Sequence, residues 1–293
     1  MNRRAWAAFA ALCVIWGVPY FFIKLAVQEI SPFEVAWGRV TLGMLIVLPI
    51  AWRRGALRAV SAHKAAIGAF AMVEFVIPFS AISFGERWIS SSLTGILLAT
   101  VPLTMALISR FFGLHEPLGA VRLLGLVTGF LGVVALLGLG TISDARGWAG
   151  VGCMLLASVG YAVGPLIIQR HLSDLPALGP VSASLLLSSI VLLPFAIATV
   201  PARLPSTTAL ASVVVLGAIC TALAMLLMFF LVGQAGAARA SVITYINPAV
   251  ATLLGVTLLH ERLGAGGATA FVLILLGSWL ATRPRASNAA LRG

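Results

Sequence analysis

One carboxylate lies deep inside an apolar segment of this 293-residue sequence. Glu74 stands in the run Ala-Met-Val-Glu-Phe-Val-Ile-Pro, ten residues after Lys64, which places it roughly 15 Å along a helix that rises 1.5 Å per residue. An ionised side chain at that depth of a membrane costs on the order of 3 kcal/mol, so it must face a polar cavity, pair or hold a proton. Two interpretations stay open: a proton-coupling or cation-binding carboxylate, and a structural acid between helices.

Arg39 is a basic residue inside the second apolar segment, about two helical turns from its outer end. One interpretation makes it an anion contact or a partner for Glu74. The other, which we favour, makes it a structural arginine that reaches outward or binds helix-end carbonyls, because a long side chain can bury its stem and keep its charge near water.

Glycine and proline interrupt two apolar segments at related places, in Trp16-Gly17-Val18-Pro19-Tyr20 and in Gly160-Tyr161-Ala162-Val163-Gly164-Pro165. Proline removes a backbone donor and bends a helix, and broken backbone is tolerated at membrane depth only where protein or a wet cavity satisfies it. The two stretches are therefore predicted either to move as gates or to be packing kinks.

Pro102 and Pro248 lie near the middle of two further apolar segments. Tyr245 and Asn247 flank the second of them and are the richest hydrogen-bonding pair in that half of the chain. These two side chains could contact a substrate, or they could hold neighbouring helices together.

The tripeptide Leu-His-Glu occurs twice, at 114–116 and at 259–261. A metalloprotease helix would need His-Glu-x-x-His, and neither copy has the second histidine. The pattern instead predicts helix ends with local pairing, for example of Glu261 with Arg262.

An intramembrane enzyme would need a catalytic group at depth, but both aspartates, Asp144 and Asp174, fall in predicted loops. The three cysteines lie within apolar segments without metal-ligand spacing. We therefore predict no catalytic residue, no metal and no cofactor, and an enzyme or a non-transporting membrane protein is the alternative.

Composition identifies an integral membrane protein, because 61% of the residues are hydrophobic, only 9% are charged and the mean hydropathy is +1.09. Soluble domains carry about 25% charged residues. The net charge of +11 comes from short basic clusters between apolar segments, which suits a lipid bilayer with anionic headgroups and not nucleic acid.

The apolar segments predict an all-α membrane protein of ten transmembrane helices, since a span needs about 20 residues. Leu-His-Glu repeats at an offset of 145 residues, so helices 1–5 (residues 1–140) are expected to repeat as helices 6–10 (residues 141–293). Five is odd, so the second copy must be inverted, as in many secondary transporters. The expected helices cover residues 5–24, 33–52, 65–84, 90–112, 118–138, 148–170, 178–199, 208–232, 238–259 and 265–282.

The distribution of lysine and arginine predicts that both termini are cytoplasmic. With the N-terminus inside, thirteen of the 19 basic residues fall on the cytoplasmic side, in keeping with the positive-inside rule. A small-residue face of Gly125, Gly129 and Gly132, with Gly277 as its shorter echo, favours close helix packing. It predicts packing within a monomer or, less directly, a homodimer.

Several features together resemble the EamA-type branch of the drug/metabolite transporter superfamily, over residues 5–282. They are Trp16-Gly17 with Lys24, Ser31-Pro32, Arg39, and Pro102 and Pro248, each followed by Leu-His-Glu. The resemblance implies a multi-pass carrier of the bacterial cytoplasmic (inner) membrane that exports amino acids, other small metabolites or drug-like solutes by alternating access.

In such carriers a central cavity is lined mainly by helices 1, 3, 4, 6, 8 and 9. The resemblance therefore implies a set of substrate-binding residues: Trp16, Glu74, Tyr161, Tyr245 and Asn247. The predicted coupling or gating residues are Glu74, Arg39, Gly17, Pro19, Gly164, Pro165, Pro102 and Pro248.

Overall fold

The structure is a computed structural model, and it describes residues 2–58, 60–109, 119–138, 142, 144–236, 240, 242–262 and 265–282. Every regular element in these ranges is helical, and no strand occurs among them. The all-α prediction is therefore confirmed.

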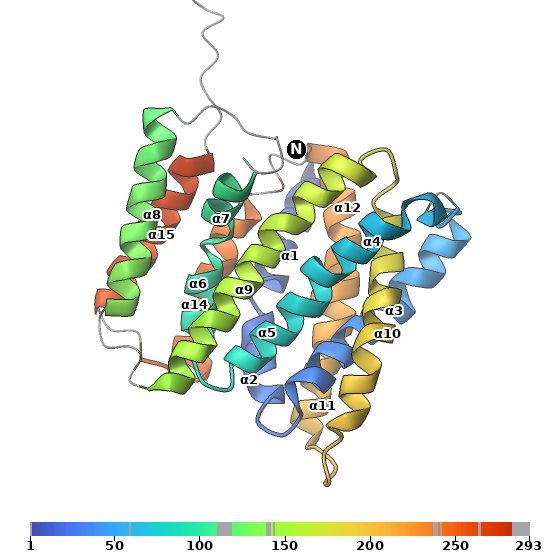
Figure 1. Ribbon diagram of the computed structural model, residues 1–293, viewed down its shortest axis with the longest axis horizontal. Coiled ribbons are helices and arrows are strands. Elements are labelled where there is room, and N and C mark those ends of the chain that lie inside the picture. The colour runs from blue at the N-terminus through green and yellow to red at the C-terminus, as the bar shows by residue number, and fades with distance from the viewer. Residues whose placement is uncertain are drawn as a thin grey trace, which may run out of the picture.

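The helices run up and down between two ends of one bundle (Figure 1). We call the end with Arg3 and Leu172 the amino face, and the end with Ala26 and Gly85 the opposite face.

The first half of the chain contains α1 (Arg3–Ile15), α2 (Pro19–Ala26), α3 (Pro32–Arg53), η1 (Val60–His63), α4 (Lys64–Phe70), η2 (Ala71–Val76), α5 (Ile77–Gly85), α6 (Ser91–Leu98), α7 (Val101–Ile108) and α8 (Ala120–Gly138). The second half contains α9 (Ala145–Ile167), η3 (Ile168–Leu172), α10 (Leu178–Ala198), α11 (Thr207–Val214), η4 (Val215–Leu223), α12 (Ala224–Ala235), α14 (Ile243–Leu258) and α15 (Ala265–Thr282).

All ten expected segments coincide with helices, with ends that differ by a few residues. Seven stretches are long and apolar enough to cross a membrane, and three apolar helices are shorter, at Ala120–Leu136, Ile243–Leu258 and Gly266–Ala281. The largest differences are at the third segment, which begins at Val60, and at the ninth, whose described helix begins at Ile243.

Two of the four apolar segments with a singled-out proline are interrupted at it, and two are continuous. The first segment is interrupted between α1 and α2, where Pro19 starts the new helix, and the fourth is interrupted between α6 and α7 near Pro102. Pro165 and Pro248 instead lie inside the continuous helices α9 and α14. The helix α9 therefore continues past Gly164-Pro165, and whether this stretch acts as a gate or as a packing kink stays a prediction.

Polar residues fix the helix starts. Ser31 and Glu34 form a capping box at α3, in which Glu34 Oε2 accepts from the Ser31 N–H at 3.1 Å and Ser31 Oγ accepts from the Glu34 N–H at 3.2 Å. A reciprocal cap satisfies two backbone donors that a helix start leaves free. Glu34 is thus part of the helix cap of α3.

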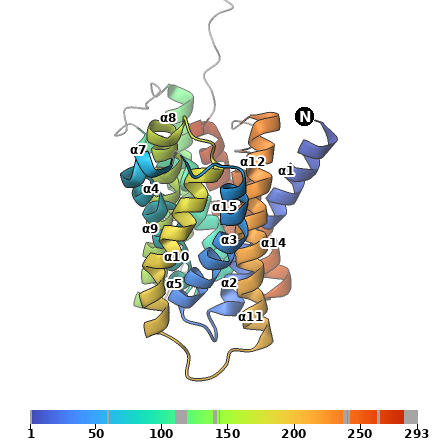
Figure 2. The same cartoon turned by 90° about the vertical axis from the view of Figure 1, so that its right-hand side faces the viewer.

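The bundle pairs helices from the two halves of the chain. α3 lies against α10, α6 against α14 and α5 against α9. Figure 2 shows α3 between α10 and the segment formed by η4 and α12. The interior of the bundle is therefore built jointly by the two halves.

Glycines let α8 and α15 pack along each other at the edge of the bundle (Figure 1). A Cβ on Gly277 would contact the backbone of Gly129 and would lie 2.7 Å from the carbonyl oxygen of Gly125. On Gly132 it would lie 2.9 Å from the backbone nitrogen of Ile274. The small-residue face is therefore used within the molecule, as the sequence favoured.

We expect Gly277→Ala to destabilise the protein strongly, because the atoms that the new methyl group would meet are backbone and cannot rotate away. Overpacking costs about 1–3 kcal/mol where side chains can adjust, so we expect about 3 kcal/mol or more here. Thermal unfolding in detergent measures the loss. Gly152→Ala is the matched control, since a Cβ there meets nothing within 4 Å, and equal stabilities of the two variants would contradict the prediction.

Candidate functional site

Two π-helical turns lie in the bundle interior, η2 and η4. Pro78 follows η2 and has no N–H to donate to the carbonyl of Glu74, four residues earlier. In η4, Thr221 Oγ1 donates to the carbonyl oxygen of Leu216 at 2.9 Å. π-turns are rare and are found frequently at functional sites, so the side chains that these turns present are the first candidates.

The η2 turn places Glu74 against α9. A Cβ on Gly164 would contact Oε2 of Glu74 and would lie 3.2 Å from its carboxyl carbon, and one on Gly160 would contact the carbonyl oxygen of Val73. Only glycines at these two positions let the wide turn approach α9 so closely. Oε2 of Glu74 is buried and accepts no hydrogen bond within the described part of the chain.

The η4 turn presents Thr221 to Arg39. Arg39 is 6% exposed, its Nε donates to Thr221 Oγ1 at 3.0 Å, and its guanidinium lies 3.7 Å over the ring of Phe79. The expectation of an outward-reaching arginine is wrong, because a hydroxyl and an aromatic face hold the charge inside the bundle. These contacts do not include Glu74, so the predicted pair is not formed in this conformation.

Two tyrosines lie near Arg39 in the bundle interior. Tyr161 packs against both of the large core clusters, and it is close enough to interact electrostatically with Glu74, Arg39 and Tyr20. Tyr20, on α2, in turn interacts with Arg39 and with Glu86. Five ionisable side chains therefore lie near one another in the bundle interior: Glu74, Tyr161, Arg39, Tyr20 and Glu86.

A second carboxylate, fully buried, lies near the opposite face, at the residue that ends α5. Glu86 is 0% exposed, and neither of its carboxylate oxygens has a hydrogen-bond partner among the described residues. Lys24 lies beside it and donates to the backbone carbonyl oxygens of Glu86 and Ile89 at 2.6 and 2.8 Å. Lys24 is thus a half-buried tie between α2 and the end of α5.

The sequence did not single out Glu86, because it stands next to Arg87 where the apolar segment ends. A charged pair at a helix end normally lies in water. The sequence around Glu86 therefore holds no signal of its burial.

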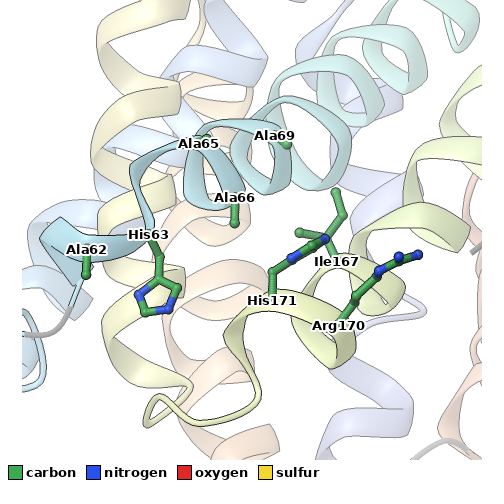
Figure 3. Close-up of a pocket in the computed structure, with 8 residues that line it drawn as sticks. All are labelled: Ala62, His63, Ala65, Ala66, Ala69, Ile167, Arg170 and His171. Atoms are coloured by element: carbon green, nitrogen blue, oxygen red, sulfur yellow. The ribbon is translucent and has the colours of Figure 1, made fainter.

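A pocket of about 650 Å³ opens toward the amino face between the two segments that meet at Glu74 and Gly164. In Figure 3, Ala66 from α4 faces Ile167 and His171 from the α9–η3 segment. The pocket is lined by Ala62, His63, Ala65, Ala66, Ala69, Ile167, Arg170 and His171. Ile167 follows Gly164 by three residues, so the pocket begins about 5 Å along the helix from the Glu74 carboxyl.

The other predicted binding residues lie elsewhere. Trp16 packs on the core cluster shared by α1, α12 and α14. With its amide nitrogen turned toward acceptors, Asn247 donates to the carbonyl oxygens of Cys13 at 3.2 Å and Ile243 at 3.0 Å. The hydroxyl of Tyr245 lies 3.4 Å from the carbonyl oxygen of Ser278. Tyr245 and Asn247 therefore face different helices, and their contact with a substrate stays a prediction.

The first-segment break is packed closely on α14. A Cβ on Gly17 would lie 2.6 Å from Cγ1 of Val250 and 3.0 Å from the carbonyl oxygen of Asn247. Glycine at this break therefore brings the backbone of the first segment into contact with α14. Whether the break also moves as a gate stays a prediction.

The second Leu-His-Glu ends α14 as expected, but Glu261 does not pair locally. His260 adopts a left-handed φ of 54°, which turns the chain back. The Glu261 carboxylate then accepts from the N–H groups of Ser91 at 2.7 Å and Ser92 at 2.9 Å, and from both serine hydroxyls at 3.2 and 2.6 Å. It caps α6 in the other half of the chain, and the first copy, 114–116, lies outside the described residues.

Comparison with known proteins shows the family of this chain. The sequence model of the EamA-like transporter family matches residues 4–138 and matches again at residues 148–283. The chain belongs to this family.

Relatives of this EamA-like transporter match over nearly its full length. It is 24% identical over 283 residues to an "Uncharacterized transporter" of Archaeoglobus fulgidus, covering 96% of this chain and 100% of the relative. It is 27% identical to the "Uncharacterized inner membrane transporter YedA" of Escherichia coli K12, covering 93% and 91%. A crystal structure at 21% identity matches with a TM-score of 0.67 over 96% of this chain and 97% of that one, which shows that the fold is shared.

These findings identify a multi-pass membrane protein of a transporter family. They point to transport and not to catalysis.

Proposed function

We propose that this protein is a proton-coupled secondary transporter that exports small metabolites, amino acids or drug-like solutes by alternating access. The observation that carries the proposal is the half-buried Glu74 side chain at a π-turn, whose Oε2 is buried against Gly164 and accepts no hydrogen bond among the described residues. Holding a proton removes the cost of a charge at this depth, so Glu74 can exchange a proton when the bundle opens.

The proposed architecture is two inverted five-helix repeats, residues 1–140 and 141–293. Three observations support it: the family model matches the two halves separately, the π-turns at 71–76 and 215–223 are separated by nearly the same offset as the two Leu-His-Glu copies, and α6 with α14 and α8 with α15 pair equivalent segments. Two such halves can rock against each other around a shared site.

The proposed location is the bacterial cytoplasmic membrane with both termini cytoplasmic. The amino face then lies inside, and the opposite face lies outside. The basic residues favour this orientation, and it places the pocket between α4 and α9 on the cytoplasmic side, where an exporter collects its solute.

In this scheme the solute enters the amino-face pocket and displaces the Glu74 proton. The positively charged rim that Arg170 gives this pocket favours a solute with a carboxylate or another anionic group. Tyr161, which interacts with Glu74, is the proposed second contact.

The test is flux in proteoliposomes that contain a pH-sensitive dye. A panel of amino acids and other carboxylates is offered under an imposed pH gradient, and the wild-type protein is expected to move protons when a transported solute is present. Glu74→Gln is expected to keep solute exchange but to lose the proton movement, since the amide cannot titrate. Glu34→Gln, which alters only the α3 capping box, is the control. Equal proton movement in wild type and Glu74→Gln would overturn the coupling role.

A further inference from the structure

Glu86 is placed where an ionised carboxylate is unfavourable. It is fully buried, it lacks hydrogen-bond donors for both oxygens among the described residues, and it is the residue that caps the C-terminal end of α5. The exposed carbonyls at a helix C-terminus carry partial negative charge and repel an anion. Desolvation by burial raises the pKa of Glu86 well above its usual range.

The charged groups around Glu86 come from four elements. Lys24 and Tyr20 face it from α2, Arg39 faces it from α3, and Glu261 faces it from the turn after α14. Arg87 follows it in its own turn and lines the same small cavity of about 130 Å³, together with Lys24, Val27 and Gln28. The two lysine and arginine charges favour the ionised form of Glu86, and Glu261 opposes it.

None of the neighbouring groups satisfies the carboxylate in the observed conformation. The Lys24 ammonium is bound to the carbonyl oxygens of Glu86 and Ile89, and Arg39 is bound to Thr221 and stacked on Phe79. Glu261 is committed to capping α6. The observed packing is therefore the packing of a neutral Glu86.

We propose that Glu86 is a second proton-binding site, and that the opposite face of the bundle stays closed only while Glu86 holds its proton. When Glu86 ionises, its bare carboxylate attracts the Lys24 ammonium away from the carbonyls at the end of α5. The tie between α2 and α5 is then broken, and the cavity beside Val27 opens. The two states differ in one proton and in the partner of one ammonium group.

A proton fits this site better than a metal ion. A divalent cation requires several oxygen ligands, whereas no group of three or more histidine, cysteine or acidic residues occurs among the described residues. The small cavity is also flanked by Lys24 and Arg87, which repel a cation. The site therefore takes up a proton and not a metal cation.

The side of the membrane from which Glu86 takes its proton rests on the proposed function. If the opposite face lies outside, closing it requires a proton from outside, and an exporter that exchanges solute for protons needs this condition. The sign is consistent: closure is complete at low pH and is lost as the pH rises through the folded-state pKa of Glu86.

The test measures opening directly, without solute or gradient. The native cysteines Cys13, Cys153 and Cys220 are replaced by alanine, and a single cysteine is placed at Val27, which is 9% exposed, or at the exposed Gln28 as the reference. The labelling rate with a membrane-impermeant maleimide is measured for both in proteoliposomes. The ratio of the Val27→Cys rate to the Gln28→Cys rate cancels the ordinary pH dependence of a thiol.

We expect this ratio to rise about fivefold or more between about pH 5.5 and about pH 8.5 when Glu86 is present, because opening follows the population of the ionised form. With Glu86→Gln the ratio should stay at its low-pH value throughout. With Lys24→Met it should stay high throughout, since the tie is absent at every pH.

A ratio that does not change with pH while Glu86 is present would overturn the proposal, and so would an unchanged response in Glu86→Gln. Glu74→Gln is expected to retain the full response. If the protein moved no protons in the transport assay but showed the pH-dependent labelling ratio, the proposed function would be refuted and the pH-dependent closure by Glu86 would stand.

Discussion

Gly164→Ala is expected to abolish most proton-driven transport while leaving the fold intact. The new methyl group would occupy the place of the Glu74 carboxylate oxygen, and that oxygen lies at the end of a flexible side chain that can rotate away. The carboxyl is then displaced from α9 without a backbone shift. A displacement of roughly 1 Å at a reacting group can cost on the order of 100-fold, so we expect gradient-driven flux to fall by at least about tenfold.

The measurement is dye-detected proton flux together with thermal unfolding. Gly152→Ala lies on the same helix with open space around it and should match wild type in both. Gly160→Ala should lose stability as well as flux, because its methyl group would meet the backbone carbonyl oxygen of Val73. If Gly164→Ala moved protons at the wild-type rate, the contact between Glu74 and Gly164 would have no role in coupling.

Glu261→Ala is expected to destabilise the opposite face. The substitution leaves two N–H groups and two hydroxyls at the start of α6 without their shared acceptor. Hydrogen bonds to charged groups contribute about 1.5–3 kcal/mol net each, and loss of an N-cap alone costs about 1 kcal/mol. We expect a loss of about 3 kcal/mol, read as a lower midpoint of thermal unfolding.

Arg262→Ala is the control for this prediction, because it tests the local pair that the sequence suggested. No ion pair joins Arg262 to Glu261 among the described residues, and the Arg262 side chain is exposed. Its removal should leave stability unchanged. Equal losses in both variants would mean that Glu261 acts through its neighbour and not as the cap of α6.

The sequence determined the membrane class, the helices and the internal repeat. Long apolar runs can be read directly, since a helix satisfies its own backbone and a bilayer requires about 20 apolar residues. The same logic identified Glu74, because an acid in the middle of such a run is costly wherever the helix is placed. Close helix packing was likewise predicted from the spacing of small residues along one helix face, at Gly125, Gly129 and Gly132.

The partners of polar groups were decided only by the tertiary structure. Arg39 was expected near water, yet Thr221 and Phe79 hold it inside. Glu261 was expected beside Arg262, yet it caps a helix 169 residues earlier in the chain. Helix spacing predicts neighbours three or four residues apart, and it contains no information about the helices that will lie alongside.

Glu86 shows this division most clearly. Its place at the end of an apolar run predicts a solvated charge, and in an isolated helix that prediction would hold. The packing of α2, α3 and the turn after α14 around the end of α5 removes the water. Burial depends on what several distant segments place at one point in space, so a carboxylate that is ordinary in the sequence becomes a proton site only in the folded bundle.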